Sequence, residues 1–121
     1  MPPHVSFSKT TDSVLRHEKD VTRRMGWKHL KPGQSFVGVE RAMGLKKGQK
    51  HVALADCRCV SNVPEPLSVL LDPANRAYAL EEMRREGFPS STPEQFVAFF
   101  CSFNRCSPDD APNRIEFEYV D

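Results

Sequence analysis

The sequence predicts an α+β fold, in which helices flank a curled β-sheet or small β-barrel. Strand-like and helix-like segments follow in the order strand, short helix, several strands, further helices and a last strand. Apolar residues recur at every second position in the expected strands, and at helical spacing in the second half. A chain of 121 residues has room for one modest core. We therefore expect residues 1–121 to form a single domain.

The first half is expected to supply most of the sheet. Residues 5–8 alternate as a short strand, and side-chain oxygens at 10–12 can cap a short helix after it. Residues 21–24 begin with two β-branched side chains, which favours an extended segment. A Pro-Gly turn is predicted before a strand at 35–40, and a longer strand is expected at 51–62. The inner face of that longer strand is expected to carry Val52, Leu54, Cys57 and Cys59.

The second half is expected to hold the remaining helices and the last strand. A short helix is predicted at 65–71 and a second one at 73–85, which Gly87 ends. Thr-Pro-Glu-Gln at 92–95 is a capping pattern that begins a third helix, and residues 114–120 alternate as the closing strand. The third helix carries an aromatic stripe, which predicts core positions for Phe96, Phe99, Phe100 and Phe103.

Charge is distributed unevenly along the chain. Residues 16–58 hold 11 Lys and Arg against four acids, whereas residues 59–121 hold five Arg against 11 acids, although the formal net charge is only +1. Such segregation favours a face that binds an anion, and nucleic acid or a nucleotide phosphate is the simplest ligand. A solvated basic surface backed by an acidic helical layer accounts for the same distribution, so charge alone leaves both interpretations open.

Several classes of protein and site are not expected. The longest apolar run, at 96–101, is far shorter than a membrane span. No basic-then-apolar leader opens the chain, so we expect a cytoplasmic protein with no membrane partner. The four cysteines lack zinc-knuckle spacing, and His17, His29 and His51 have no spaced partner. We therefore expect reduced, partly buried thiols, no metal and no cofactor.

One segment places a base near a nucleophile. If it is extended, Thr22 and Arg24 share one face, while Arg23 points to the other. Lys19 lies just before this segment, where its amine can fold back toward the Thr22 hydroxyl as a base if burial lowers its pKa. Glu86 is expected at a helix end, where a carboxylate meets unfavourable helix-dipole charge, which suggests a functional role or an ion pair. Spacing alone favours the simpler interpretation, a surface cation run and a helix-end ion pair.

Several short motifs follow one another in a characteristic order between Phe7 and Val120. They are Lys19-x-x-Thr22-x-Arg24, Leu30-Lys31-Pro32-Gly33-Gln34, Gly44-Leu45-Lys46-Lys47-Gly48-Gln49, Glu86-Gly87-Phe88, Glu94-Gln95-Phe96 and Arg114-Ile115-Glu116-Phe117-Glu118-Tyr119. Their order and spacing resemble ASCH domains, a branch of the PUA-like superfamily, in the form common in bacteriophages and prophages.

The resemblance implies a nucleic-acid or nucleoside role, because PUA-like barrels bind RNA or modified bases in a cleft beside the sheet. Some small ASCH proteins hydrolyse the acetyl amide of N4-acetylcytidine with a Lys, a Thr and a Glu, and others are described as ribonucleases. These positions correspond to Lys19, Thr22 and Glu86, with Arg24 as the cation beside them. Lys19 would accept the Thr22 proton, Glu86 would orient the lysine, and Arg24 would hold an oxyanion or the base carbonyl. An added loop at 44–50 and a longer helical segment leave the substrate open.

Further residues are expected to contact a nucleic acid. Trp27 lies in a basic stretch, which suits base stacking beside phosphate neutralisation, although a lone Trp also suits a barrel plug. The expected contacts are Arg23, Trp27, Lys28, Lys31, Lys46, Lys47 and Lys50. Three functions are compatible with the sequence: a module that binds RNA, DNA or a modified nucleoside, a hydrolase in the same cleft, and a phage protein that docks on a host complex. The sequence is also compatible with a protein partner, and it does not indicate an oligomeric state.

Overall fold

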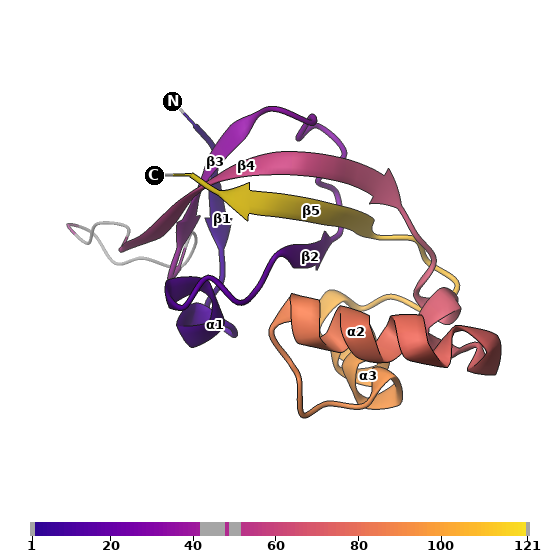
Figure 1. The fold of residues 1–121 in the computed structure, drawn as a ribbon. Coiled ribbons are helices and arrows are strands. Elements are labelled where there is room, and N and C mark those ends of the chain that lie inside the picture. The colour runs from indigo at the N-terminus through magenta and orange to yellow at the C-terminus, as the bar shows by residue number, and fades with distance from the viewer. Residues whose placement is uncertain (1, 42–47, 49–51, 121) are drawn as a thin grey trace.

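A computed structural model describes residues 2–41, 48 and 52–120, and it shows a curled sheet flanked by helices (Figure 1). Among these residues the sheet has five strands, in the order β1-β3-β4-β5-β2. β1 pairs with β3 in parallel, and the other neighbouring strands are antiparallel. The strands are β1 (His4–Ser6), β2 (Val21–Arg24), β3 (Ser35–Val39), β4 (Ala53–Pro64) and β5 (Asn113–Tyr119). The predicted α+β class with a curled sheet is confirmed.

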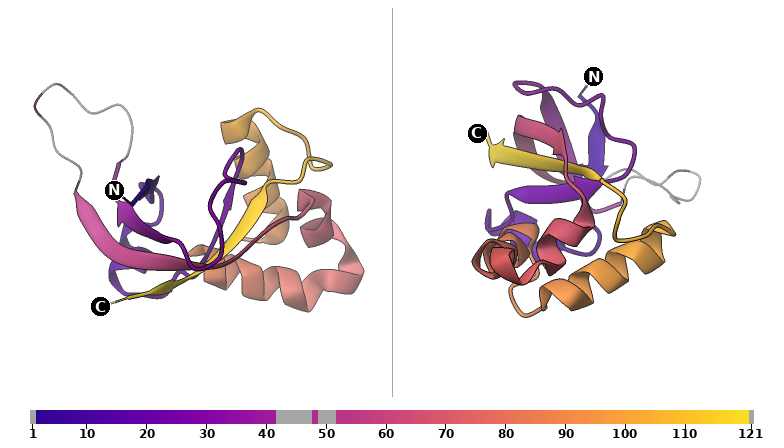
Figure 2. Two further views of the ribbon diagram at one scale, coloured as in Figure 1. Left: turned by 90° about the horizontal axis from the view of Figure 1, so that it is seen from above. Right: turned by 90° about the vertical axis from the view of Figure 1, so that its right-hand side faces the viewer.

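The two edge strands of the sheet are neighbours in the sequence. β1 and β2 stand at opposite ends of the strand order, and α1 (Thr11–Leu15) lies between them in the chain. The curl of the sheet, visible from two directions in Figure 2, brings the edges together. Arg24 on β2 donates a hydrogen bond to the main-chain oxygen of Ser6 on β1. The candidate site lies where these edges meet.

The end of α2 (Arg76–Glu86) and the start of α3 (Pro93–Asn104) follow the residues that the sequence singled out. The predicted side-chain cap of α1 is wrong, because Thr10 precedes α1 without a side-chain hydrogen bond to it. Two short 3-10 helices, Leu67–Leu71 and Pro73–Asn75, lead into α2. Gly87 ends α2 with a φ of 93°, in the left-handed region that glycine tolerates. α3 starts with a complete capping box, in which the Thr92 hydroxyl accepts from the Gln95 N–H at 3.1 Å. The predicted capping box is therefore confirmed.

The apolar side chains form two clusters rather than one. The first fills the sheet and contains Val5, Phe7, Val14, Leu30, Phe36, Cys57, Cys59, Ile115 and Phe117. The second joins α2 and α3 to the first 3-10 helix and contains Leu67, Leu70, Ala79, Met83, Phe96, Val97 and Phe100. In Figure 1 both helices lie together at one end of the sheet, away from the chain termini. The contact between α2 and β2 therefore lies between two apolar clusters.

Two predictions about the core are wrong. Phe96 and Phe100 are buried, but Phe99 and Phe103 are 47% and 68% exposed, because α3 is covered along one side only. Val52 is 55% exposed. Residues 52 and 54 have the opposite parity to 57 and 59, so a regular strand cannot place all four on one face. Cys57 and Cys59 take the inner face, while Leu54 is only partly buried.

Two further findings concern expectations from the sequence. The four cysteines are free thiols, and Cys57 and Cys59 are buried. No helix within the described part of the chain is long and apolar enough to cross a membrane.

Candidate functional site

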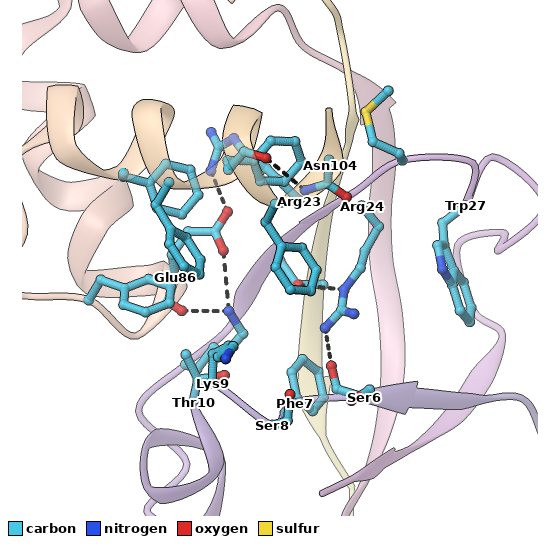
Figure 3. Close-up of a pocket in the computed structure, with 18 of the residues that line it drawn as sticks. Ser6, Phe7, Ser8, Lys9, Thr10, Arg23, Arg24, Trp27, Glu86 and Asn104 are labelled. Carbon is cyan, nitrogen blue, oxygen red and sulfur yellow. Dashed lines mark hydrogen bonds and ion pairs between the residues drawn. The ribbon is translucent and has the colours of Figure 1, made fainter. Parts of the chain in front are cut away.

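A pocket of about 710 Å³ opens beside the meeting edges of the sheet (Figure 3). Its walls come from β1 and the residues after it, from β2, and from α3. The lining residues are His4, Ser6, Phe7, Ser8, Lys9, Thr10, Lys19, Thr22, Arg23, Arg24, Met25, Trp27, Arg41, Glu86, Phe88, Phe96, Phe99, Phe100, Phe103 and Asn104. The structure thus gathers Lys19, Thr22, Arg24 and Glu86, the four predicted catalytic positions, in one pocket.

Lys19 lies in the wall of this pocket with only 2% of its surface exposed. Its Nζ donates to the main-chain oxygen of Glu86 and lies 3.2 Å from the Glu86 Oε1. The same Nζ is 5.7 Å from the centre of the Phe7 ring and 6.0 Å from that of Phe88. Burial lowers the pKa of Lys19 to about 8, and Arg24 also acts to lower it, while Glu86 opposes both. Such an amine can exchange protons near neutral pH.

Glu86 is the last residue of α2, and its carboxylate is shared between two cations. One oxygen faces Lys19, and the other accepts from Arg23 Nη1 at 2.9 Å. The left-handed turn at Gly87 ends the helix there and leaves the Glu86 main-chain oxygen free to accept from Lys19. The ion pair that the sequence suggested for this helix end is present, and both partners are buried.

Arg23 points away from Thr22 and Arg24, as the strand alternation predicts, but it meets α2 rather than solvent. Its side chain is 1% exposed, and its Nη2 lies 2.7 Å from Glu65 and 2.6 Å from Glu82. Arg23 was predicted to contact nucleic acid, but almost none of its surface is exposed.

Glu82 and Arg114 complete an ion-pair layer that consists of Arg23, Glu65, Glu82, Glu86 and Arg114. The sequence did not predict a site role for Glu82 or Arg114. Arg114 on β5 donates to Glu82 from Nε at 2.6 Å and from Nη2 at 3.0 Å. Burial acts against the Glu82 carboxylate, yet Arg114 and Arg23 together hold its pKa down at about 2. A signal was available, since Glu82 and Glu86 are four apart on α2 and so share a helix face with each other. The layer joins the sheet cluster to the helical cluster.

Thr22 and Arg24 form the other wall of the site. The Thr22 Oγ1 accepts from the Arg24 Nε at 3.0 Å, so the predicted shared face is confirmed. The Arg24 guanidinium lies 5.3 Å from the centre of the Phe7 ring, and burial lowers the pKa of Arg24 against the influence of Glu86. Among the described residues no hydrogen bond joins Lys19 to Thr22. A base–nucleophile step between them would need a bridging water or a small side-chain movement.

The remaining predicted contacts lie in different places. Trp27 lines the pocket, is partly buried against the sheet cluster, and its ring centre lies 4.9 Å from that of His29. Lys28 and Lys31 are exposed and do not line the pocket. Lys46, Lys47 and Lys50 lie outside the described residues.

The outer wall of the pocket is aromatic. Phe99 and Phe103 extend from α3 with ring centres 6.0 Å apart and planes inclined by 23°. A second hollow of about 410 Å³ adjoins the first, and the two share Lys9, Phe88, Phe96 and Phe99. In Figure 3 Glu86 lies on one side of the pocket and Trp27 on the other, with Arg24 between them. Polar groups are thus held among aromatic surfaces.

Comparison with known proteins shows a likeness of fold. No protein-family model matches the chain, and no curated protein matches it. The chain is similar to the crystal structure of protein EF3133 from Enterococcus faecalis V583, of the family DUF984, with a TM-score of 0.67 and 20% sequence identity. The match covers 100% of this chain and 81% of that chain. This likeness supports the curled sheet with flanking helices as the fold of the chain.

Proposed function

We propose that the chain is an ASCH-type, PUA-like domain whose pocket binds a nucleobase, in RNA or DNA or as a modified nucleoside. The observation that carries this proposal is the placement of Lys19, Thr22, Arg24 and Glu86 within one aromatic-walled pocket. The motif order supports the family, and the curled sheet is compatible with it. The pocket volume of about 710 Å³ falls in the usual range for small-ligand sites.

A nucleobase needs flat apolar contacts for its faces and donors or acceptors for its edge. Trp27 and Phe88, which are partly exposed, supply aromatic surface inside the pocket, and Phe99 and Phe103 supply it at the outer wall. Base–aromatic stacking contributes about 1–3 kcal/mol per base. These side chains therefore suit the faces of the base.

The polar groups suit the edge of the base. Arg24 and Lys19 are donors, and Glu86 is an acceptor. Lys9, which lines both hollows and is exposed, is placed to meet a phosphate. Because Lys9 would act through exposed charge, its contribution to binding should fall as salt rises.

The proposal is tested by titration with a panel of ligands: cytidine, N4-acetylcytidine and short single-stranded RNA and DNA. Trp27 is the only tryptophan of the chain and lines the pocket, so its fluorescence reports on occupancy. Arg24→Met should weaken binding at least tenfold, because it removes a charged donor. Leu80→Ala, on the exposed surface of α2, is the control and should bind like the wild type. Absence of binding to every member of the panel would refute the proposal.

A second candidate is hydrolysis of an amide on the bound base. It is favoured by the lowered pKa of Lys19, about 8, and by the 3.2 Å contact with Glu86. Water would add to the acyl carbon, the C–N bond would break, and acetate and the free amino group would form. Lys19 would accept a proton from the attacking water or from Thr22.

This candidate is tested by incubating the protein with N4-acetylcytidine and measuring the release of cytidine and acetate by chromatography. Lys19→Met and Thr22→Val should each abolish release, while Leu80→Ala should leave the rate unchanged. If both pocket variants still release cytidine, this pocket is not the hydrolytic site. If the wild type binds N4-acetylcytidine without releasing cytidine, only the proposed binding function stands.

A further inference from the structure

The Arg23 side chain forms ion pairs with three carboxylates inside the protein, so few of its donors are left for a ligand. Its two terminal nitrogens contact Glu86, Glu82 and Glu65 at 2.9, 2.6 and 2.7 Å. Among the described side chains its Nε has no hydrogen-bond partner. The guanidinium is therefore oriented by Glu82 and Glu86 on α2 and by Glu65 just after β4, while its backbone belongs to an edge strand of the sheet.

The contact with Glu86 links Arg23 to the pocket. The Glu86 carboxylate offers one oxygen to Lys19 at 3.2 Å and the other to Arg23 at 2.9 Å. A single negative charge thus faces two buried cations, and Arg24 adds a third cation nearby. The contact with Arg23 is the shorter of the two carboxylate contacts, so the negative charge of Glu86 does not belong to Lys19 alone.

Within the described part of the chain, Glu86 is the one carboxylate that forms an ion pair with the Lys19 amine. Phe7, after β1, and Phe88, after α2, present aromatic rings to it. From β5, Tyr119 donates its hydroxyl to the main-chain oxygen of Lys19 rather than to the side chain. From α1, the main-chain oxygen of Ser13 accepts from the Lys19 N–H. Burial therefore acts on the amine together with the carboxylate of Glu86, which opposes it.

We propose that Arg23 is a positioning residue: by holding one oxygen of Glu86, it divides that carboxylate between two cations and keeps the Lys19 amine able to give up its proton in the pocket. This inference rests on the proposed function, in which Lys19 meets the ligand. Glu65 and Glu82 fix the guanidinium, so that Glu86 cannot turn both of its oxygens to Lys19. Arginine suits this task because its planar fork can contact several carboxylates at once, whereas a lysine is a single point of charge.

The inference is tested by the titration of Lys19 itself, without ligand. In protein labelled with 13C-lysine, the side-chain signal of Lys19 is identified by its absence from Lys19→Met and is followed from pH 6 to 11. Arg23→Met should raise the midpoint by about one pH unit, because Glu86 is released to pair with Lys19 alone and a repelling cation is removed. Arg23→Lys should raise it less, since the charge stays but the fork is lost.

Arg84→Met is the matched control. Arg84 lies on α2 close to Glu86 in sequence, but its ion pair with Glu81 is exposed, so the Lys19 midpoint should not move. Circular dichroism checks that each variant is folded, and Arg23→Lys decides the question if Arg23→Met does not fold. Folded variants that melt earlier but titrate Lys19 at the wild-type midpoint would assign Arg23 a structural role only and overturn the inference. Because no ligand enters this measurement, a wild type that binds no nucleobase would refute the proposed function separately.

Discussion

The ion-pair layer gives its clearest prediction through Glu82. This carboxylate is 1% exposed and accepts from Arg23 at 2.6 Å and from Arg114 at 2.6 and 3.0 Å. Its pKa is lowered from 4.5 to about 2, which corresponds to roughly 3 kcal/mol of stability at neutral pH. Because the folded-state pKa is the lower one, this stability is present above pH 4.5 and is lost as pH falls toward 2.

Glu82→Gln removes the charge and keeps the shape of the side chain. At pH 7 it should lower the free energy of unfolding by about 3 kcal/mol, or the melting temperature by about 10 °C in a chain of this length. At pH 3 the difference from the wild type should be clearly smaller. At that pH Glu82 is mostly protonated in the unfolded wild type but still mostly ionised in the folded wild type, so the wild type has lost part of this stability. Urea unfolding followed by circular dichroism at both pH values measures the two differences.

Glu81→Gln is the control for this experiment. Glu81 is the neighbouring residue on α2, and its ion pair with Arg84 is exposed, so its loss should leave the free energy of unfolding unchanged. A difference between Glu82→Gln and the wild type that is equally large at pH 7 and pH 3 would refute the reasoning, because it would not come from the charge of Glu82.

Three further changes test other parts of the structure. Gly87→Ala should lower the free energy of unfolding by about 1–3 kcal/mol in urea titrations, because φ is +93° and the new Cβ would lie 3.0 Å from Thr10 and 3.2 Å from Ser13; an unchanged midpoint would contradict the turn geometry. Thr92→Ala should cost about 1 kcal/mol by the same measurement through loss of the capping box, and Thr92→Ser should restore most of it. Phe103→Ser should leave the melting temperature unchanged, since the side chain is 68% exposed, yet weaken ligand binding severalfold; equal affinity would remove Phe103 from the site.

Most of the fold could be predicted because its signals are local. The capping box at Thr92, the stop at Gly87 and the alternation in β5 each depend on a few adjacent residues, and all three are confirmed. The exposure of Phe99 and Phe103 could not be predicted in this way. Helical spacing shows that residues share a side of a helix, but not how much of that side a partner covers.

The site was predictable in part for the same reason. Alternation correctly separated Arg23 from Thr22 and Arg24, but the sequence could not show that the Arg23 face meets α2. That contact joins residues about 60 positions apart, and the partner Glu82 gave only the weak signal of a second acid on one helix face. Lys19 and Glu86, which are also far apart, were brought together by the motif resemblance alone, and their contact is present.

The pairing of β2 with β5 has a consequence for the order in which the protein can form. β2 is an edge strand, and its register runs from Val21 opposite Glu116 to Arg24 opposite Asn113. Tyr119, at the end of β5, also holds the main-chain oxygen of Lys19. During synthesis the segment that carries Lys19 and Thr22 is therefore made well before β5, the strand that pairs with it. Such distant pairings form slowly, so the pocket should be among the last features to assemble, and a nascent chain that ends before β5 should have no ligand site.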